Sequence, residues 1–371
     1  MESETISPLL GVPGAVDSAG PDAGVPAHYG SPLAEQRALA SGVAIAEVGR
    51  GVVTVTGPDR LSWLDSLTSQ RLTGLQPGES AESLLLDPHG HVEHDLRIVD
   101  DGDTAWLLVQ REEAPSLAAF LTRMRFLLRV EVVDVTETTA VLGGLEGSTV
   151  PVPALVTWAD PWRTGAPGGV QYASPAAHPA SEWTWTETVV RRDDVAALAD
   201  LARRGEVRLA GALAVEALRV AAWRPRLGAD TDERTIPHEL DWLRSAVHLS
   251  KGCYRGQETV AKVHNLGRPP RRLVLLHLDG SENVPVVSGA PVLDRATGKE
   301  VGAVTSPAVH HELGPIALAV VKRGLDAAAP LVVSVDGEAV AATQEVIVPA
   351  DAGAALGDLP KLPRLGSAAR R

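Results

Sequence analysis

The chain has 371 residues, a hydrophobic content of 44% and a formal net charge of −13 at pH 7. This length suffices for two or three domains, and the acidic balance opposes nonspecific binding to nucleic acid or anionic membranes. There is no uninterrupted run of about 18 apolar residues and no basic N-terminal segment before an apolar stretch, so a cytoplasmic protein without membrane or direct nucleic-acid partners is expected.

Composition and periodicity divide the chain into five segments. Residues 1–27 are rich in Gly, Pro, Ala and Ser without a hydrophobic period, which predicts a disordered N-terminal arm. Residues 28–142 combine strands with segregated helices, which favours an α+β domain. A second α+β domain is expected over 143–268, a small antiparallel β-barrel over 269–348 and a flexible tail over 349–371.

The individual elements follow from hydrophobic spacing and turn residues. Helices are predicted in chain order over residues 58–69, 114–128, 193–204, 209–223, 238–249 and 257–264. Strands are predicted before the barrel over residues 44–48, 52–56, 83–86, 92–99, 104–109, 130–135, 139–142, 154–158 and 169–172. In the barrel, six strands are expected, and Thr297-Gly298 and Asp336-Gly337 are hairpin turn signals.

The only cysteine, Cys253, lies in the octapeptide KGCYRGQE. The other members of this motif are Lys251, Gly252, Tyr254, Arg255, Gly256, Gln257 and Glu258. Glycines and cations do not build an apolar pocket, so an accessible sulfur is expected. The free N–H groups at the start of the following helix, together with Lys251 and Arg255, would stabilise a thiolate, which predicts a reactive Cys253. The alternative is a cysteine that packs as a small hydrophobe.

A single cysteine excludes an intrachain disulfide and a cysteine-built zinc or iron–sulfur cage within one chain. Histidines 89, 91 and 94 lie near Asp87 and Asp95, but alternation along a strand places them on opposite faces. No metal site is therefore predicted.

The octapeptide matches the Lys-Gly-Cys-Tyr-x-Gly-Gln-Glu signature of the YgfZ family, folate-binding proteins related to the T-protein (aminomethyltransferase) of the glycine cleavage system. Residues 216–239 resemble the helix and loop that precede this signature in the superfamily. Residues 52–96 resemble, more weakly, the superfamily's N-terminal domain. The three similarities together cover most of residues 30–345.

The resemblance implies an α+β fold of three domains around a central channel, with a C-terminal antiparallel β-barrel. It implies that the channel binds tetrahydrofolate or another folate. The family's function would be to support assembly or repair of iron–sulfur clusters, including those of tRNA-modifying enzymes, through the reactive cysteine. Partners would be iron–sulfur assembly factors or client iron–sulfur proteins. An iron–sulfur cluster that is shared transiently with a partner is a further cofactor that the resemblance allows. The resemblance implies a transferase-like fold that serves an accessory factor, and it leaves undecided whether the protein catalyses a reaction.

The resemblance also implies site residues. Cys253 would engage a cluster, sulfur donor or partner cysteine, with Lys251 tuning the sulfur. Asp95 stands at the similar place to the T-protein aspartate that positions the folate nitrogen, although a solvated strand-edge carboxylate is an equal alternative. Arg219 and Trp223 are candidates for a folate's carboxylates and ring system. The alternative for Arg219 is an exposed pair with Glu216.

Two other functions remain open from the sequence. One is a true aminomethyltransferase, which moves a one-carbon unit from a lipoyl-bound aminomethyl group onto tetrahydrofolate and needs no cysteine. The other is a non-catalytic folate-binding scaffold whose cysteine only packs. The octapeptide favours the cysteine-dependent role in iron–sulfur cluster assembly or repair over both of these functions.

Overall fold

The computed structural model describes residues 6–174, 178–281 and 284–353. Its helices are α1 (Pro32–Ala40), α2 (Arg60–Leu67), α3 (Ala114–Met124), α4 (Asp194–Arg203), α5 (Ala212–Ala221) and α6 (Gln257–Leu266). Within these described ranges, no helix is long and apolar enough to cross a bilayer. The first helix was missed by the sequence analysis, and the others lie within the predicted segments or extend them slightly.

The strands before the barrel are β1 (Val16–Asp17), β2 (Pro26–His28), β3 (Ala44–Val48), β4 (Arg50–Thr56), β5 (Ser80–Leu86), β6 (Val92–Asp100), β7 (Thr104–Gln110), β8 (Glu131–Asp134), β9 (Thr139–Gly144), β10 (Ala154–Ala159), β11 (Thr186–Arg191) and β12 (Arg208–Leu209). The later strands are β13 (Arg271–Leu278), β14 (Pro291–Asp294), β15 (Glu300–His310), β16 (Gly314–Lys322), β17 (Leu331–Val335) and β18 (Glu338–Val346).

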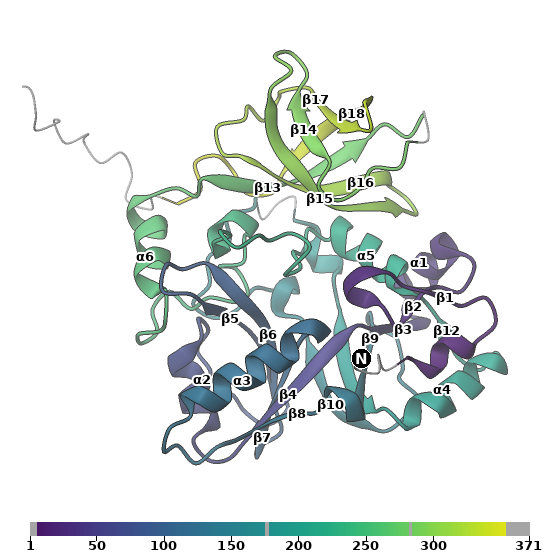
Figure 1. Ribbon diagram of the computed structural model, residues 1–371, viewed down its shortest axis with the longest axis vertical. Helices are drawn as coiled ribbons and strands as arrows, with labels where there is room; N and C mark the ends of the chain where they lie inside the picture. The colour runs from purple at the N-terminus through teal and green to yellow at the C-terminus, as the bar shows by residue number, and fades with distance from the viewer. Residues whose placement is uncertain (1–5, 175–177, 282–283, 354–371) are drawn as a thin grey trace, which may run out of the picture.

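These strands build a two-stranded sheet of β1 and β2, two five-stranded sheets and a barrel. The first sheet has the order β5-β6-β7-β4-β8, and the second has the order β10-β11-β9-β3-β12. The six C-terminal strands close into an antiparallel barrel of order β13-β16-β15-β14-β17-β18, which sits at the top of the molecule in Figure 1, above the two sheets. The predicted α+β class and C-terminal barrel are confirmed.

The two sheets interleave in the sequence. Strand β3 ends at Val48 and β4 begins at Arg50, so only Gly49 separates strands that belong to different sheets. Strand β9 also joins the second sheet, although the sequence places it in the first domain. The expected boundary at residue 142 therefore does not separate the sheets, because a strand's pattern specifies its conformation and not its partner.

The N-terminal segment is ordered, which corrects the expectation of a disordered arm over 1–27 for its described part, from residue 6 onward. Leu9 and Val25 are fully buried, and β1 pairs with β2. Leu9 packs in one apolar cluster with Val195 and Leu198 of α4. The few apolar residues of this segment bury against distant parts of the chain, which local composition does not reveal. Residues 1–5, and residues 354–371 of the predicted tail, lie outside the described ranges.

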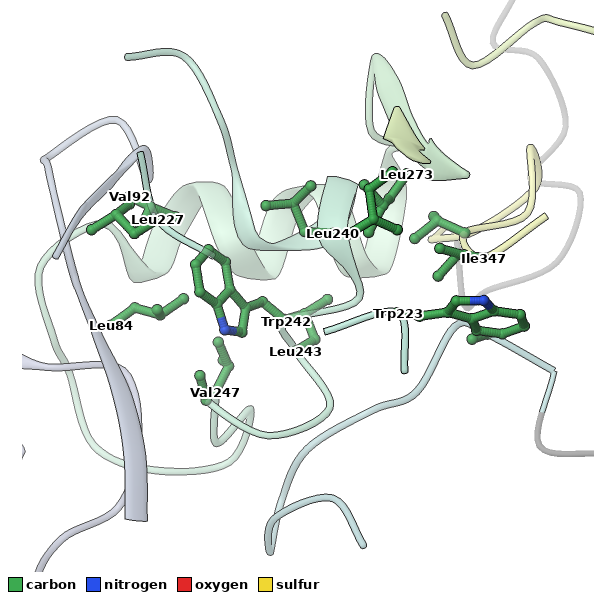
Figure 2. Close-up of a cluster of buried hydrophobic side chains, with 14 of the residues drawn as sticks. Leu84, Val92, Trp223, Leu227, Leu240, Trp242, Leu243, Val247, Leu273 and Ile347 are labelled. Carbon is green, nitrogen blue, oxygen red and sulfur yellow. The ribbon is translucent and has the colours of Figure 1, made fainter. Parts of the chain in front are cut away.

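The segment between α5 and α6 is compact and mostly non-helical. The predicted helix over 238–249 is wrong: a single 3-10 turn, Pro237–Leu240, is followed by Asp241 at φ 56°, a left-handed conformation that stops a helix. Figure 2 shows the side chains of this segment packed together with apolar residues from the first sheet and from the barrel. The labelled residues are Leu84, Val92, Trp223, Leu227, Leu240, Trp242, Leu243, Val247, Leu273 and Ile347. This core joins the first sheet, the connecting segment and the barrel.

Candidate functional site

The octapeptide forms a loop that ends at the start of α6. Gly252 and Cys253 are exposed, while Lys251 before them and Tyr254 after them are buried. Tyr254 belongs to the core cluster of Figure 2, and the Lys251 Nζ lies 5.4 Å from the centroid of its ring. The accessible sulfur predicted from the sequence is present, between two anchored neighbours.

Lys251 is directed into the protein. Its ammonium donates hydrogen bonds to the backbone carbonyls of Asp65, Thr68 (2.7 Å) and Gln70 (2.8 Å), at the end of α2 and in the loop that follows it. The carboxylate of Asp65 lies 3.5 Å away. Burial lowers the pKa of Lys251, although Asp65 opposes this shift. Since an ammonium has three N–H donors, all of them are used on this loop. The sequence analysis predicted that Lys251 stabilises the Cys253 thiolate. In the structure, its hydrogen bonds go to backbone carbonyls of the first domain instead.

Arg255 forms an ion pair with Glu93. Its Nη1 lies 2.7 Å from the Glu93 carboxylate, and its guanidinium carbon lies 5.8 Å from the centroid of the Phe120 ring on α3. Glu93 thus offsets part of the positive charge that the sequence placed beside Cys253.

Gly256 and Gly90 hold the loop against the β5–β6 hairpin. Gly256 has φ 82°, and a Cβ added there would lie 2.6 Å from the Asp87 carbonyl oxygen. Gly90 has φ 84°, and its added Cβ would lie 2.8 Å from Thr259 on α6. Only glycine suits both positions.

Helix α6 begins at Gln257, as predicted, and Gly256 caps it, so Cys253 lies three residues before the cap. Glu258 is exposed in the first turn, and Gln257 Nε2 lies 3.5 Å from the Lys251 carbonyl oxygen. At Gly252, an added Cβ would meet nothing within 4 Å. The lack of a side chain there leaves the neighbouring thiol uncovered.

A second candidate site is a buried cluster of carboxylates and guanidinium groups where the two sheets and the connecting segment meet. Arg224 reaches Glu82 on β5 at 2.5 Å and Asp160 after β10 at 3.0 Å. Glu82 also accepts a hydrogen bond from the indole of Trp242, at 2.9 Å. Asp95 lies on β6 beside this group and is 3% exposed, so it is not a solvated strand-edge residue.

Glu187 on β11 extends this cluster by pairing with arginines on β4 and β6 of the first sheet. It pairs with Arg50 at 3.0 Å and with Arg97, and it accepts a hydrogen bond from the Trp185 indole at 3.0 Å. Arg97 in turn lies 4.0 Å from Asp95. Sequence reasoning missed Arg50, Glu82, Arg97, Asp160, Glu187 and Arg224, because nothing in their local spacing signals a shared site.

Two donors of the cluster, Arg97 Nε and Arg224 Nη1, are buried without a hydrogen bond within the described part of the chain, while the carboxyl groups of Asp95 and Glu82 hydrogen-bond each other. Burial, and then the negative charge of Glu82, raise the pKa of Asp95 well above its usual value; the hydrogen bond between the two carboxyl groups adds to this shift, and Arg224 opposes it. A protonated Asp95 can donate as well as accept. The two unpaired guanidinium donors, beside a carboxyl pair that shares a proton, are groups that the polar edge of a pterin ring can bond, so the donor set fits a folate.

Arg219 has its donors occupied by the protein. It reaches Asp230 at 2.7 Å, Ser306 of the barrel at 2.6 Å and Glu216 at 2.9 Å. The expectation of an exposed Glu216–Arg219 pair is therefore wrong, and Asp230 is also buried, at 1% exposed. The barrel covers this turn of α5 and the loop that carries Asp230. The spacing of Glu216, Arg219 and Asp230 in the sequence does not reveal where the barrel lies.

Trp223 belongs to the apolar core. Its ring centroid lies 5.2 Å from that of His178, and Figure 2 shows it beside Ile347. Arg219 instead lines a cavity of about 40 Å³ together with Asp22, Arg50, Glu216 and Arg226. Arg50 connects this cavity to the buried cluster. Asp22, from the N-terminal segment, was also missed by the sequence analysis.

The chain has an aminomethyltransferase-like fold. Residues 24–147 match the GCVT N-terminal domain, and residues 271–348 match the glycine cleavage T-protein C-terminal barrel domain. An aminomethyltransferase of Rippkaea orientalis is 26% identical over 351 residues, which cover 85% of this chain and 88% of the relative. The chain belongs to the superfamily of the glycine cleavage T-protein.

Two further comparisons bear on function and fold. The iron-sulfur cluster assembly factor IBA57 homolog, mitochondrial, of Mycosarcoma maydis is 24% identical over 243 residues, covering 61% of this chain and 55% of the relative. The crystal structure of the glycine cleavage system aminomethyltransferase T from Bartonella henselae superposes with a TM-score of 0.71, at 20% identity, over 91% of this chain and 94% of that one. The latter establishes the fold.

Proposed function

We propose that this chain is a YgfZ-type, tetrahydrofolate-binding protein that supports assembly or repair of iron–sulfur clusters, including those of tRNA-modifying enzymes, through Cys253. The observation that carries the proposal is the exposed cysteine on an otherwise anchored loop. Aminomethyl transfer needs no thiol, so a transferase has no use for this arrangement. A relative named as an iron–sulfur cluster assembly factor supports the same reading.

The folate would be held by the unpaired atoms of the buried cluster. Asp95, with its raised pKa, would hold a proton at its carboxyl group and donate it to a ring nitrogen, while Arg97 and Arg224 would donate to ring acceptors. A bound tetrahydrofolate supplies a reduced nitrogen that can carry a one-carbon unit. The cavity beside Arg50, of about 40 Å³, is smaller than a pterin ring, so binding requires side chains or the N-terminal segment to move.

Cys253 would act as a nucleophile, or as one of several thiolate ligands of an iron–sulfur cluster. One thiolate cannot hold a cluster alone, so a cluster at this position would be shared with thiolates of an assembly factor or client protein. The anchored loop would present the sulfur at a fixed place, which lowers the entropy cost of forming such a contact.

A folate-dependent aminomethyltransferase is the second candidate. It is favoured by the family matches at both ends of the chain and by the buried Asp95, and it would leave Cys253 dispensable. A non-catalytic folate-binding scaffold would leave it dispensable too.

Titration calorimetry of tetrahydrofolate into wild type, Cys253→Ala and Asp95→Asn tests the proposal, with iodoacetamide alkylation of the thiol followed in the same samples. We expect micromolar binding in wild type and Cys253→Ala, weaker binding in Asp95→Asn, and a folate-dependent alkylation rate. Cys253→Ala that restores iron–sulfur enzyme activity in a deletion strain as well as wild type would reject the role of the thiol. Absence of folate binding in every variant would reject the ligand.

A further inference from the structure

The turn after α3 exposes three consecutive apolar side chains. Phe126 is 83% exposed, Leu127 is 99% exposed and Leu128 is 41% exposed. Isolated apolar residues are common on protein surfaces, but a run of three on one turn is not, and such runs mark interaction sites. We call residues 126–128 the apolar tip.

The backbone of the apolar tip is fixed rather than loose. The Leu128 N–H donates to the Arg125 carbonyl at 2.9 Å, and Phe126 between them has φ 45°. That position of a turn normally selects Gly, Asn or Asp, and a bulky aromatic residue is strained there. Strained conformations are retained where they serve a function.

The base of the apolar tip is also clamped. Arg129 pairs with Asp59, its backbone N–H donating at 2.9 Å and its Nη2 lying 2.8 Å from the carboxylate. A Cβ on Gly57 would lie 2.2 Å from the Arg129 carbonyl oxygen, so glycine allows this close approach. The next residue, Val130, is buried. The protein therefore holds the three apolar side chains in solvent.

We propose that the apolar tip is a docking site for a protein partner whose apolar groove is bordered by carboxylates. Arg123 and Arg125 flank the tip and are exposed, and within the described residues neither is paired with a carboxylate. Two exposed cations that no carboxylate neutralises within the described residues, beside an apolar projection on a chain of net charge −13, select an acidic rim on the partner.

The same charges disfavour the other occupants. A second copy of the chain, packed tip to tip, would place these arginines against one another. An anionic membrane surface is held by clusters of about 4–8 basic residues, more than this turn offers on an acidic protein. Helix α3, which leads into the tip, contacts the octapeptide, because Phe120 of α3 lies under both Arg123 and Arg255.

The test starts with a photo-crosslinking amino acid at position 127, and at position 266 as the control, because Leu266 is likewise exposed at 61% but lies on α6. The protein crosslinked at 127 is purified and titrated against wild type, Leu127→Asp, Arg125→Glu and Leu266→Asp. We expect at least a tenfold loss of affinity for Leu127→Asp, a several-fold loss for Arg125→Glu that shrinks with added salt, and no change for Leu266→Asp.

The proposal is overturned if position 127 yields no protein adduct beyond that at 266, or if Leu127→Asp binds the captured protein as wild type does. It is also overturned if sedimentation shows self-association that Leu127→Asp abolishes, or if the tip instead binds vesicles containing phosphatidylglycerol. Because Leu127 is almost fully exposed, its substitution should leave the melting temperature unchanged, which separates lost docking from misfolding.

Discussion

Asp22 and Arg226 form a two-pronged ion pair that joins the N-terminal segment to the loop after α5. The two carboxylate oxygens of Asp22 lie 2.7 and 2.8 Å from Nη1 and Nη2 of Arg226. Both residues line the small cavity that Arg50 connects to the buried cluster. The pair therefore ties the N-terminal segment to the loop after α5.

Replacing Asp22 by Asn should loosen this segment. Arg226 would keep only Gln110 and a more distant Glu216 as partners, and leaving a largely buried charge underpaired costs about 1–3 kcal/mol. Urea denaturation should show this loss, and hydrogen exchange should become faster over residues 18–28. Asp200→Asn, which breaks an exposed pair with Arg203, is the control and should change neither. Unchanged exchange in Asp22→Asn would mean that Leu9 and Val25 hold the segment alone.

Lys251→Met should destabilise the protein. Three backbone carbonyls would lose their donor in a buried place, for which we expect a loss of about 2–4 kcal/mol in the free energy of unfolding. Lys251→Arg should not restore it, because a planar guanidinium does not match three converging carbonyls. A variant of normal stability with slower alkylation of Cys253 would instead give Lys251 the sulfur-tuning role predicted from the sequence.

The two glycines of the octapeptide should respond differently. Gly256→Ala adds a Cβ at positive φ and against the Asp87 carbonyl, which should cost about 1–3 kcal/mol in thermal or chemical denaturation. Gly252→Leu adds a side chain in open space, so it should leave stability unchanged and slow the alkylation of Cys253 several-fold. Equal stability losses in both variants would contradict this division.

Asp241 should make stability depend on pH. Burial raises its pKa from 3.8 to about 7, although backbone N–H groups of Tyr172 and Ala173 oppose the shift. The folded state then holds a proton that the unfolded state has released, so stability is greatest below pH 4 for this group and falls by about 4 kcal/mol as pH rises to 7. Denaturation midpoints of Asp241→Asn should lack this decline between pH 4 and 7. A mutant whose midpoints fall as steeply as those of wild type would assign the decline to another group.

Elements with a strong local pattern could be predicted from the sequence. The barrel strands alternate and are separated by turn residues, and α6 was placed at its correct first residue, Gln257. Helix α3 was predicted four residues too long, because Leu127 and Leu128 look like a continuing apolar face while the backbone has already turned at Phe126. Apolar residues that face solvent are misread by any rule that assumes they are buried.

The site was only partly predictable. The motif around Cys253 stands out because glycines and cations flank a lone cysteine. The direction of Lys251 could not be deduced, since its partners are carbonyl groups 181 to 186 residues earlier in the chain. Likewise, Asp95 was identified by resemblance, but its neighbours Glu82 and Arg224 come from other elements and only the tertiary fold brings them together.

The single residue between β3 and β4 has a consequence for biosynthesis. Strand β3 needs β9 and β12, and the N-terminal segment needs α4 and Arg226, so the beginning of the chain cannot complete its contacts until about residue 226 has left the ribosome. The first sheet, by contrast, has all its strands by Asp134. A nascent chain would therefore carry a nearly finished sheet beside an unpaired β3 edge, a state in which chaperone binding is expected and in which early termination would leave an aggregation-prone fragment.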